Sequence, residues 1–203
     1  MSTSERSTAV RLARRFAVVA LSALVVAGAA GCDRGSLNGA GGTPGVPDRA
    51  HLVAARVVRI ADGDSFEARL ADGRRSGVRI GGIDAPERRQ AWADRARRNL
   101  HELIGTRPVW LEIAKTDRYG RLVAHVFVAS GDAAGSALVD VGHAQVAAGW
   151  AWFYRRYAEE MPPSRRGRYD AAERDAQRLR LGLWRDPEPI PPWVWRQRHP
   201  RSR

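Results

Sequence analysis

The sequence predicts an α+β fold, built from five short strands and about three helices. Three segments with β-branched or alternating apolar residues come first, a helical pattern follows, and two further strand segments precede the last helices. Strands and helices in this order are typical of α+β domains. Five short strands are also compatible with a small closed barrel, although their periodicity does not separate a barrel from an open sheet.

The first three strand candidates form a meander. Asp-Gly pairs lie between consecutive candidates and suit tight turns. Two more candidates flank the turn "DRYG". The five segments are "HLVAARVVRI" (51–60), "SFEARL" (65–70), "VRIGGID" (78–84), "PVWLEIA" (108–114) and "RLVAHVFV" (121–128).

Three segments show helical patterns. A short helix is expected around 142–149 and a longer one around 165–182. The segment 87–105 ends in a glycine that suits a helix C-terminus. It carries apolar residues at roughly helical spacing, namely Ala91, Ala96, Leu100 and Leu103.

The chain carries a large positive charge, because 34 Lys and Arg residues face 22 Asp and Glu residues, for a net +12. The first fifty positions hold six arginines and three acids, so the remainder has 28 basic and 19 acidic residues and a net +9. Such a surplus favours nucleic acid or anionic membranes as partners. A compositional bias explains it equally well, since every basic residue except Lys115 is an arginine.

The first 32 residues are organised like a secretory signal. Arg11, Arg14 and Arg15 lie just before the apolar run 16–31, which is shorter than the roughly 20 residues that a membrane-spanning helix needs. The run ends in "AAGC", which resembles a bacterial lipobox in which Cys32 becomes lipidated. Cleavage at "AGA" (27–29) without lipid, or an uncleaved anchor, are the alternatives. We therefore expect an exported protein, held at the cell envelope membrane by a lipid on Cys32 or secreted.

Four segments follow from these features: a signal peptide (1–32), a flexible linker (33–50), a folded domain (51–186) and a tail rich in Pro, Trp and Arg (187–203). The linker is rich in Gly and Pro and has no apolar periodicity. Cys32 is the single cysteine of the chain, which excludes an internal disulfide and thiolate zinc clusters. We expect a monomer.

Five short motifs occur in order along the folded part. Together they resemble the staphylococcal-nuclease-like (thermonuclease) family over roughly 53–184. The resemblance implies a five-stranded OB-fold barrel with about three helices. It also implies a calcium-dependent endonuclease that hydrolyses DNA and RNA with little sequence specificity. The motifs are "DGDS" (62–65), "RIGGIDAPE" (79–87), "DRYGR" (117–121), "GWAWFYRRY" (149–157) and "LGLW" (181–184).

The acidic residues of the first two motifs match the family's Ca²⁺ site. The resemblance assigns Asp64 and Asp84 as carboxylate ligands and the backbone carbonyl of Ala85 as a third ligand. Carboxylate and carbonyl oxygens form the hard, oxygen-rich site that Ca²⁺ prefers. Asp62 matches another acid of the turn, and it either supports the ligands or simply forms the turn.

Three further residues match the family's catalytic positions. Glu87 matches the proposed general base, although an organising role for water is the alternative. Arg79 and Arg121 match two arginines that grip the scissile phosphate. A guanidinium suits this role because its planar fork donates two hydrogen bonds at once and stays charged.

Substrate contacts beyond the scissile phosphate are assigned by the same resemblance. Tyr119 matches a tyrosine that touches a terminal phosphate, and Arg118 stands where the family often has lysine. Tyr157 aligns with an aromatic residue that stacks on a base. Arg155 falls where the staphylococcal type has a second tyrosine, so we expect weaker or rearranged stacking.

Regular strand alternation would place Arg79 and Asp84 on opposite faces, because they are an odd number of residues apart. A bulge or kink at Gly81 and Gly82 would shift the phase by one and let both side chains reach one pocket. Pro86 would then end the strand pairing and help to direct Glu87 to the same place.

The prolines of the tail exclude a long helix. Trp193 and Trp195 occupy alternate positions there. They either pack on the barrel as a strap, which we favour, or offer stacking faces beside Arg196 and Arg198.

Three functions compete. The first is the exported endonuclease, the second a non-catalytic nucleic-acid-binding OB-fold module on a lipoprotein, and the third a structural lipoprotein. Modules of the second kind typically lose the catalytic acids and arginines, whereas the corresponding side chains are present here. This favours the enzyme, through Asp64, Arg79, Asp84, Glu87 and Arg121.

Overall fold

The computed structural model describes residue 47 and residues 49–105, 107–131 and 136–200. All of them belong to the second of two units of the chain, Ala40–Arg203. The predicted signal peptide, the lipidation of Cys32 and almost all of the predicted linker lie outside the described residues. Within the described ranges, no helix combines the length and apolar character that crossing a membrane requires.

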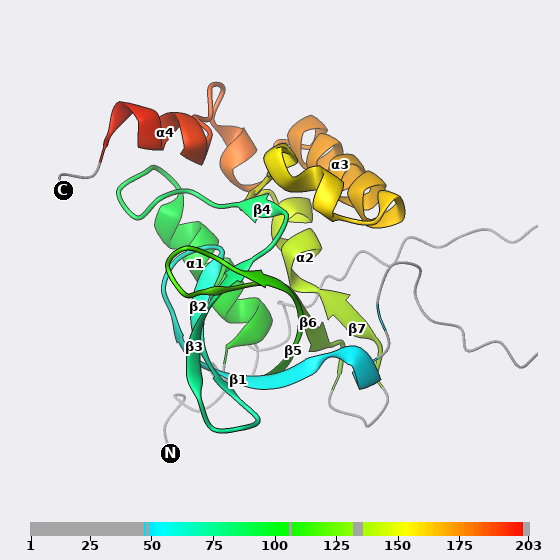
Figure 1. Ribbon diagram of the computed structural model, residues 1–203. Coiled ribbons are helices and arrows are strands. Elements are labelled where there is room, and N and C mark those ends of the chain that lie inside the picture. Colours follow the sequence, from blue (N-terminus) through cyan, green and yellow to red (C-terminus); the bar gives the residue numbers. More distant parts are fainter. Residues whose placement is uncertain (1–46, 48, 106, 132–135, 201–203) are drawn as a thin grey trace, which may run out of the picture. The chain divides into compact units, whose positions relative to one another are not determined.

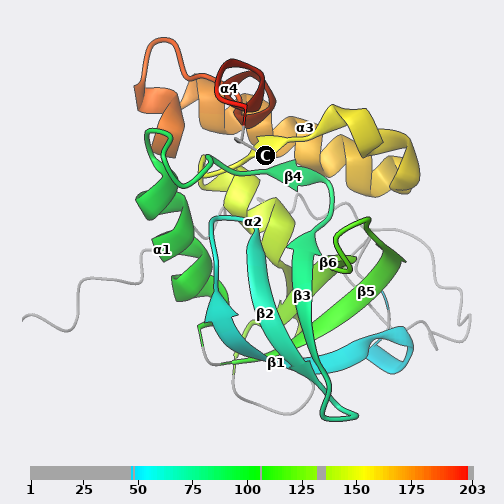
Figure 2. The ribbon, with the colours of Figure 1, turned by 60° about the vertical axis from the view of Figure 1, so that its left-hand side comes forward.

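Five strands close into a barrel (Figures 1 and 2). Antiparallel pairing joins β2 to both β1 and β3, and joins β5 to both β1 and β6. A parallel pairing of β3 with β6 completes the circle, which confirms the predicted α+β, OB-type barrel. The strands are β1 (Val53–Ile60), β2 (Ser65–Leu70), β3 (Arg75–Ile80), β5 (Pro108–Thr116) and β6 (Leu122–Ala129).

Alternating side chains fill the barrel. The pairing register shifts between Val57 and Arg59 in β1, and between Ile113 and Lys115 in β5. Such irregularities increase strand twist and help a small sheet to close on itself. The interior residues are at most 1% exposed and include Ala68, Val78, Ile80, Val109, Leu111 and Val126.

Three helices of the domain match the predicted segments: α1 (Ala93–Ile104), α2 (Val141–Ala147) and α3 (Pro163–Arg178). Helix α1 packs against β1 and α2, and α2 packs against α3. A short strand, β7 (Leu138–Asp140), lies beside β6 and leads directly into α2, whose N-terminus is capped by the Asp140 carboxylate.

Helix α1 starts later than the sequence pattern indicated. The segment that follows Asp84 runs as a loop up to Trp92. Trp92 has a left-handed φ of 71°, so a helix cannot run through it and α1 begins only at Ala93. The expected core position Ala91 is therefore exposed, and Ala93 is buried in its place. The buried face of α1 otherwise follows helical spacing through Ala96 and Leu100.

The chain breaks out of the barrel at the glycine pair, as the predicted kink requires. Strand β3 ends at Ile80, the N–H of Gly81 still donates to the Ala124 carbonyl at 2.8 Å, and Gly82 takes a φ of 76°. The next two residues form β4 (Ile83–Asp84), which pairs with β8 (Trp152–Phe153) in a separate small sheet. The glycine pair thus separates two strands instead of forming a bulge within one.

The tail folds back over the domain. A one-turn 3-10 helix, η3 (Gly182–Arg185), leads to the short helix α4 (Pro192–Arg198). The Trp193 ring packs with centroids 6.4 Å from Trp152 and 5.5 Å from Tyr154, so this residue packs on the domain at β8 and not on the barrel strands, where the strap was expected. Trp195 instead stacks on His199, with ring centroids 3.9 Å apart.

Gly82→Ala tests the kink, because a Cβ at Gly82 would lie 2.9 Å from the Met161 Sδ in addition to the strain of a positive φ. We expect the free energy of unfolding to fall by about 2–3 kcal/mol. Gly73 also has a positive φ, 85°, but a Cβ there meets nothing within 4 Å. Gly73→Ala is the matched control and should cost about 1 kcal/mol in urea unfolding. Equal losses in both variants would contradict tight packing at the kink.

Candidate active site

The acidic turn between β1 and β2 is built without spare room. Its backbone closes through the N–H of Ala61, which donates to the Ser65 carbonyl at 2.9 Å. A Cβ on Gly63 would lie only 2.7 Å from the Cβ atoms of both Ala85 and Ala96. Glycine at this position therefore lets the turn pack directly against α1 and against the segment that follows β4.

A buried side-chain amide on α2 holds this turn in place. The side chain of Gln145, on α2, is fully buried. Its Nε2 donates to the carbonyl of Gly63 at 2.6 Å and to that of Ala96 at 3.2 Å. Because these contacts join α1, α2 and the turn, the position of the turn depends on the packing of both helices.

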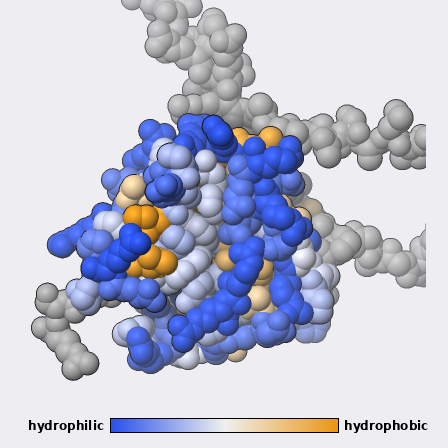
Figure 3. Space-filling view, turned by 90° about the horizontal axis from the view of Figure 1, so that it is seen from above, coloured by the Kyte–Doolittle hydropathy of each residue, from blue (hydrophilic) through white to orange (hydrophobic). Residues whose placement is uncertain are grey.

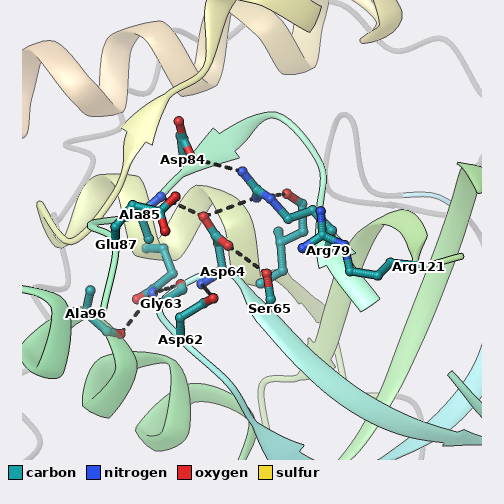
Figure 4. A network of polar contacts seen from close by, with 12 residues as sticks. Asp62, Gly63, Asp64, Ser65, Arg79, Asp84, Ala85, Glu87, Ala96 and Arg121 are labelled. Carbon is teal, nitrogen blue, oxygen red and sulfur yellow. Dashed lines mark hydrogen bonds and ion pairs between the residues drawn. The ribbon is translucent and has the colours of Figure 1, made fainter. Parts of the chain in front are cut away.

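Arg79 brings the two principal carboxylates together (Figure 4). Its Nη1 lies 3.2 Å from the Asp64 Oδ2 and its Nη2 lies 3.1 Å from the Asp84 Oδ1. Asp64 is 6% exposed and Asp84 is 1% exposed. The kink thus places residues 79 and 84 in one site, as expected from the sequence.

Ala85 connects the two acidic segments directly. Its buried N–H donates to the Asp64 Oδ2 at 2.7 Å, while the Ser65 hydroxyl donates to Oδ1 at 2.9 Å. Both carboxylate oxygens of Asp64 therefore have a fixed orientation. Ala85, which was expected to supply a backbone ligand, follows Asp84 in the chain and contacts Asp64 through its N–H.

Burial sets the protonation of the acidic group. Burial, and then the charge of Asp64, raise the pKa of Asp62 to about 7. Burial also raises the pKa of Asp84, although hydrogen bonds from Arg196 oppose this shift. These carboxylates are therefore costly to ionise in the folded protein unless a cation lies beside them.

Glu87 reaches the site through a contact from the tail. Its Oε1 accepts a hydrogen bond of 2.8 Å from the Arg196 Nη1, and the same nitrogen lies 3.2 Å from the Asp84 Oδ1. The loop that carries Glu87 is also held locally, because its N–H donates to the Gln90 Oε1 at 3.1 Å. The Gln90 amide in turn donates to the Ile190 carbonyl of the tail.

Arg121 lies on the same face as Arg79 but has its own partner. Val123 pairs with Arg79 across β6 and β3, so Arg121, two residues earlier, points to the same side. Its stem packs over Gly77, where a Cβ would come within 3.1 Å. Its guanidinium is paired with Asp117 at 2.8 Å.

The predicted substrate-contact residues lie on two exposed segments, the turn before β6 and the segment η2 (Arg155–Glu160). Arg118 and Tyr119 belong to the turn before β6, where the arginine Nη2 donates to the tyrosine hydroxyl at 2.8 Å. Tyr157 lies in the 3-10 segment η2, half-exposed, with the Lys115 Nζ 4.7 Å from its ring centroid. Their roles in binding stay predictions.

Arg155, which replaces an expected tyrosine, anchors η2. Its guanidinium lies 2.7 Å from a Glu173 oxygen and 2.6 Å from an Asp170 oxygen on α3. The aromatic neighbour of Tyr157 is instead Tyr154, with ring centroids 5.5 Å apart. Tyr154 also contacts Trp193, so the tail extends this aromatic group.

Several residues of the site are not apparent from the sequence pattern. Asp117 orients Arg121, Gln145 supports the acidic turn, and Gln90 ties the Glu87 loop to the tail. In the sequence, Arg196 stands out only as a neighbour of the tail tryptophans. A lone Gln or Asp carries no local pattern, so only the position of Asp117 within "DRYGR" offered a signal.

The donor set fits one hard divalent cation. Two buried carboxylates, Asp64 and Asp84, both lie against the guanidinium of Arg79, so they are oriented toward one shared positive charge. Both are oxygen donors, as Ca²⁺ prefers. Among the described residues, no group of three or more His, Cys, Asp or Glu side chains is arranged as a metal cluster. A cation here would therefore also need ligands such as the Ala85 carbonyl and water.

Asp62→Asn tests the effect of burial on the acidic turn. In the metal-free protein, the folded state keeps a proton on Asp62 up to about pH 7, whereas an aspartate in the unfolded chain loses it near its ordinary pKa of 3.8. The folded state thus binds more protons, and wild-type stability should fall as the pH rises from 5 to 8. Asp62→Asn should reduce that fall by about 2 kcal/mol.

Urea unfolding at pH 5 and pH 8 in EDTA measures this slope. Asp72 is the control, since hydrogen bonds from Arg74 lower the pKa of this exposed carboxyl. Asp72→Asn should leave the fall between pH 5 and pH 8 in place. An Asp62→Asn variant with the full wild-type slope would contradict the account.

Comparison with known proteins identifies the family. The family model described as staphylococcal nuclease homologue matches residues 77–186. A micrococcal nuclease of Shigella flexneri is 38% identical over 142 residues, covering 70% of this chain and 79% of that protein. The protein ParB of Escherichia coli is 39% identical over 142 residues, covering 70% of this chain and 77% of that protein.

A third relative supports the same conclusion. An uncharacterized endonuclease of Escherichia coli O157:H7 is 32% identical over 148 residues, covering 72% of this chain and 86% of that protein. The matched region contains the kink between β3 and β4, the Glu87 loop and the segment that carries Arg121. The chain therefore belongs to the staphylococcal nuclease family of nuclease enzymes.

Proposed function

We propose that this nuclease is a calcium-dependent endonuclease that hydrolyses DNA and RNA with little sequence specificity. One observation carries the proposal: a partly buried arginine, Arg79, bridges the carboxylates of Asp64 and Asp84 beside Glu87. Phosphodiester hydrolysis needs these groups together, because a water must lose a proton while the phosphate oxygens gain negative charge.

Each side chain has a role in this chemistry. Glu87 accepts the proton of the attacking water, since it is a partly exposed carboxylate at the edge of the acidic pair. Arg79 donates hydrogen bonds to the nonbridging oxygens, and its ion pairs with Asp64 and Asp84 orient its planar fork. Arg121 approaches from the adjacent strand, with its guanidinium oriented by Asp117.

Asp64, Asp84 and the carbonyl of Ala85 would hold the Ca²⁺. When bound, the cation supplies positive charge against the phosphate oxygens. The carboxylates are already fixed by hydrogen bonds from the Ala85 N–H and the Ser65 hydroxyl, so binding needs little rearrangement of Asp64. A bound cation also offsets the cost of ionising the buried Asp84.

Broad substrate use follows from the groups around the site. Arginines grip phosphates, and phosphate contacts carry no base information. The exposed Tyr119 and Tyr157 offer stacking faces, which accept any base. The face seen in Figure 3 is largely hydrophilic, with small and separate hydrophobic patches, as suits a charged polymer.

A non-catalytic binding module is the less favoured alternative. It would need no oriented carboxylate pair, because the backbone of a nucleic acid is bound by positive charge. Burying the carboxylates of Asp64 and Asp84 costs desolvation free energy. A surface patch of arginines would bind nucleic acid without that cost. The family membership favours the enzyme as well.

Glu87→Gln and Arg79→Lys test the proposed catalytic roles. With supercoiled plasmid and about 10 mM Ca²⁺, we expect Glu87→Gln to lower the nicking rate about 100- to 1000-fold, because the amide cannot accept the proton. Arg79→Lys should lower it about 100-fold, since lysine keeps the charge but loses the fork. Both variants should retain the wild-type circular dichroism spectrum.

Matched controls lie on the exposed face of α1. Glu102→Gln and Arg97→Lys make the same chemical changes away from the site and should keep the wild-type rate. EDTA should abolish nicking, and a single-stranded RNA should be cut under the same conditions. Wild-type activity in Glu87→Gln, or undiminished activity in EDTA, would refute the corresponding part of the proposal.

A further inference from the structure

The C-terminal helix places a second guanidinium on the acidic site. The Arg196 Nη2 donates to the Asp84 Oδ2 at 2.8 Å, and its Nη1 lies 3.2 Å from Oδ1. The same Nη1 donates to the Glu87 Oε1 at 2.8 Å. One planar fork thus spans both oxygens of a buried carboxylate and reaches the neighbouring glutamate, which is the strongest arrangement available to an arginine.

This contact is built into the fold of the tail. Pro192, at the start of α4, is buried, and Trp193 packs on Trp152 and Tyr154. The Gln90 side chain binds the Ile190 carbonyl just before α4. Both ribbon views show α4 above the loop that follows β4 (Figures 1 and 2). Arg196 therefore starts from an anchored helix, and its half-exposed side chain closes the outer edge of the site.

The positions that Arg196 occupies are those that a cation on Asp84 would use. The Oδ1 of Asp84 already accepts hydrogen bonds from Arg79 and Arg196, and Oδ2 accepts one from Arg196. The guanidinium uses carboxylate lone pairs that a divalent cation would need as ligands. Its positive charge would also repel the cation at short range.

We propose that Arg196 is an internal counter-ion that competes with the divalent cation for Asp84. Without metal, it neutralises Asp84 and engages the Glu87 oxygen that would otherwise accept a proton. With metal, the guanidinium leaves both carboxylates and becomes available to a phosphate of the substrate at the edge of the site. This inference rests on the proposed metal site at Asp64 and Asp84.

Competition of this kind has a defined thermodynamic consequence. Binding of the cation and docking of Arg196 weaken each other by the same factor, because the coupling free energy is reciprocal. The tail therefore sets the metal concentration at which the site becomes active. A protein without the Arg196 contact would bind metal more tightly but would have a less stable metal-free state.

Calcium titration by isothermal calorimetry tests the inference directly, without reference to activity. We expect Arg196→Gln to bind Ca²⁺ about fivefold to tenfold more tightly than the wild type. Arg196→Lys, which keeps the charge but not the fork, should fall between them. Calcium should also raise the Tm of Arg196→Gln more than that of the wild type.

Arg198→Gln is the matched control, because it removes the same charge from the same helix at an exposed position. It should leave the Ca²⁺ affinity within about twofold of the wild type. Unchanged or weaker binding by Arg196→Gln, or an equal gain in Arg198→Gln, would overturn the inference while the metal site itself stands. A wild type that binds no Ca²⁺ would overturn the proposed metal dependence and the inference together.

Discussion

The site depends on one guanidinium, which bridges two buried carboxylates. Arg79 lies between Asp64 and Asp84, at 3.2 and 3.1 Å, where either carboxylate alone would be costly to bury. Burial lowers the pKa of Arg79, but the two carboxylates more than offset this, so the pKa is raised and the charge is retained. The positive charge of Arg79 therefore holds the acidic turn and β4 in one site, because the buried carboxylate of each needs a cationic partner.

The rest of the fold makes that arrangement possible. The left-handed Gly82 turns the chain from the barrel to the small β4–β8 sheet, so that two residues an odd number apart can meet. Gly63 lets the acidic turn pack against α1, and Gln145 fixes it from α2. Helices α1 and α2 therefore hold the acidic turn in place, whereas strand β3 of the barrel carries Arg79.

Periodicity and turn residues predicted the barrel strands, the three main helices and the kink at Gly81 and Gly82. The predicted start of α1 was wrong, because the helical spacing of apolar residues does not reveal that Trp92 has a left-handed backbone. Strands β4 and β8 have two residues each, too few for any alternation to appear. The contact of Arg196 with Asp84 joins residues 112 positions apart, and only the folding of the tail brings them together.

We propose that Asp64 and Asp84 hold one divalent cation while Arg79 binds the scissile phosphate. A crystal structure of the Glu87→Gln variant with Ca²⁺ and a short single-stranded DNA tests it most directly. We predict a Ca²⁺ ion in contact with both carboxylates and a phosphate hydrogen-bonded to Arg79. A Ca²⁺ ion bound elsewhere, with Arg79 still bridging Asp64 and Asp84 in the presence of DNA, would contradict the account.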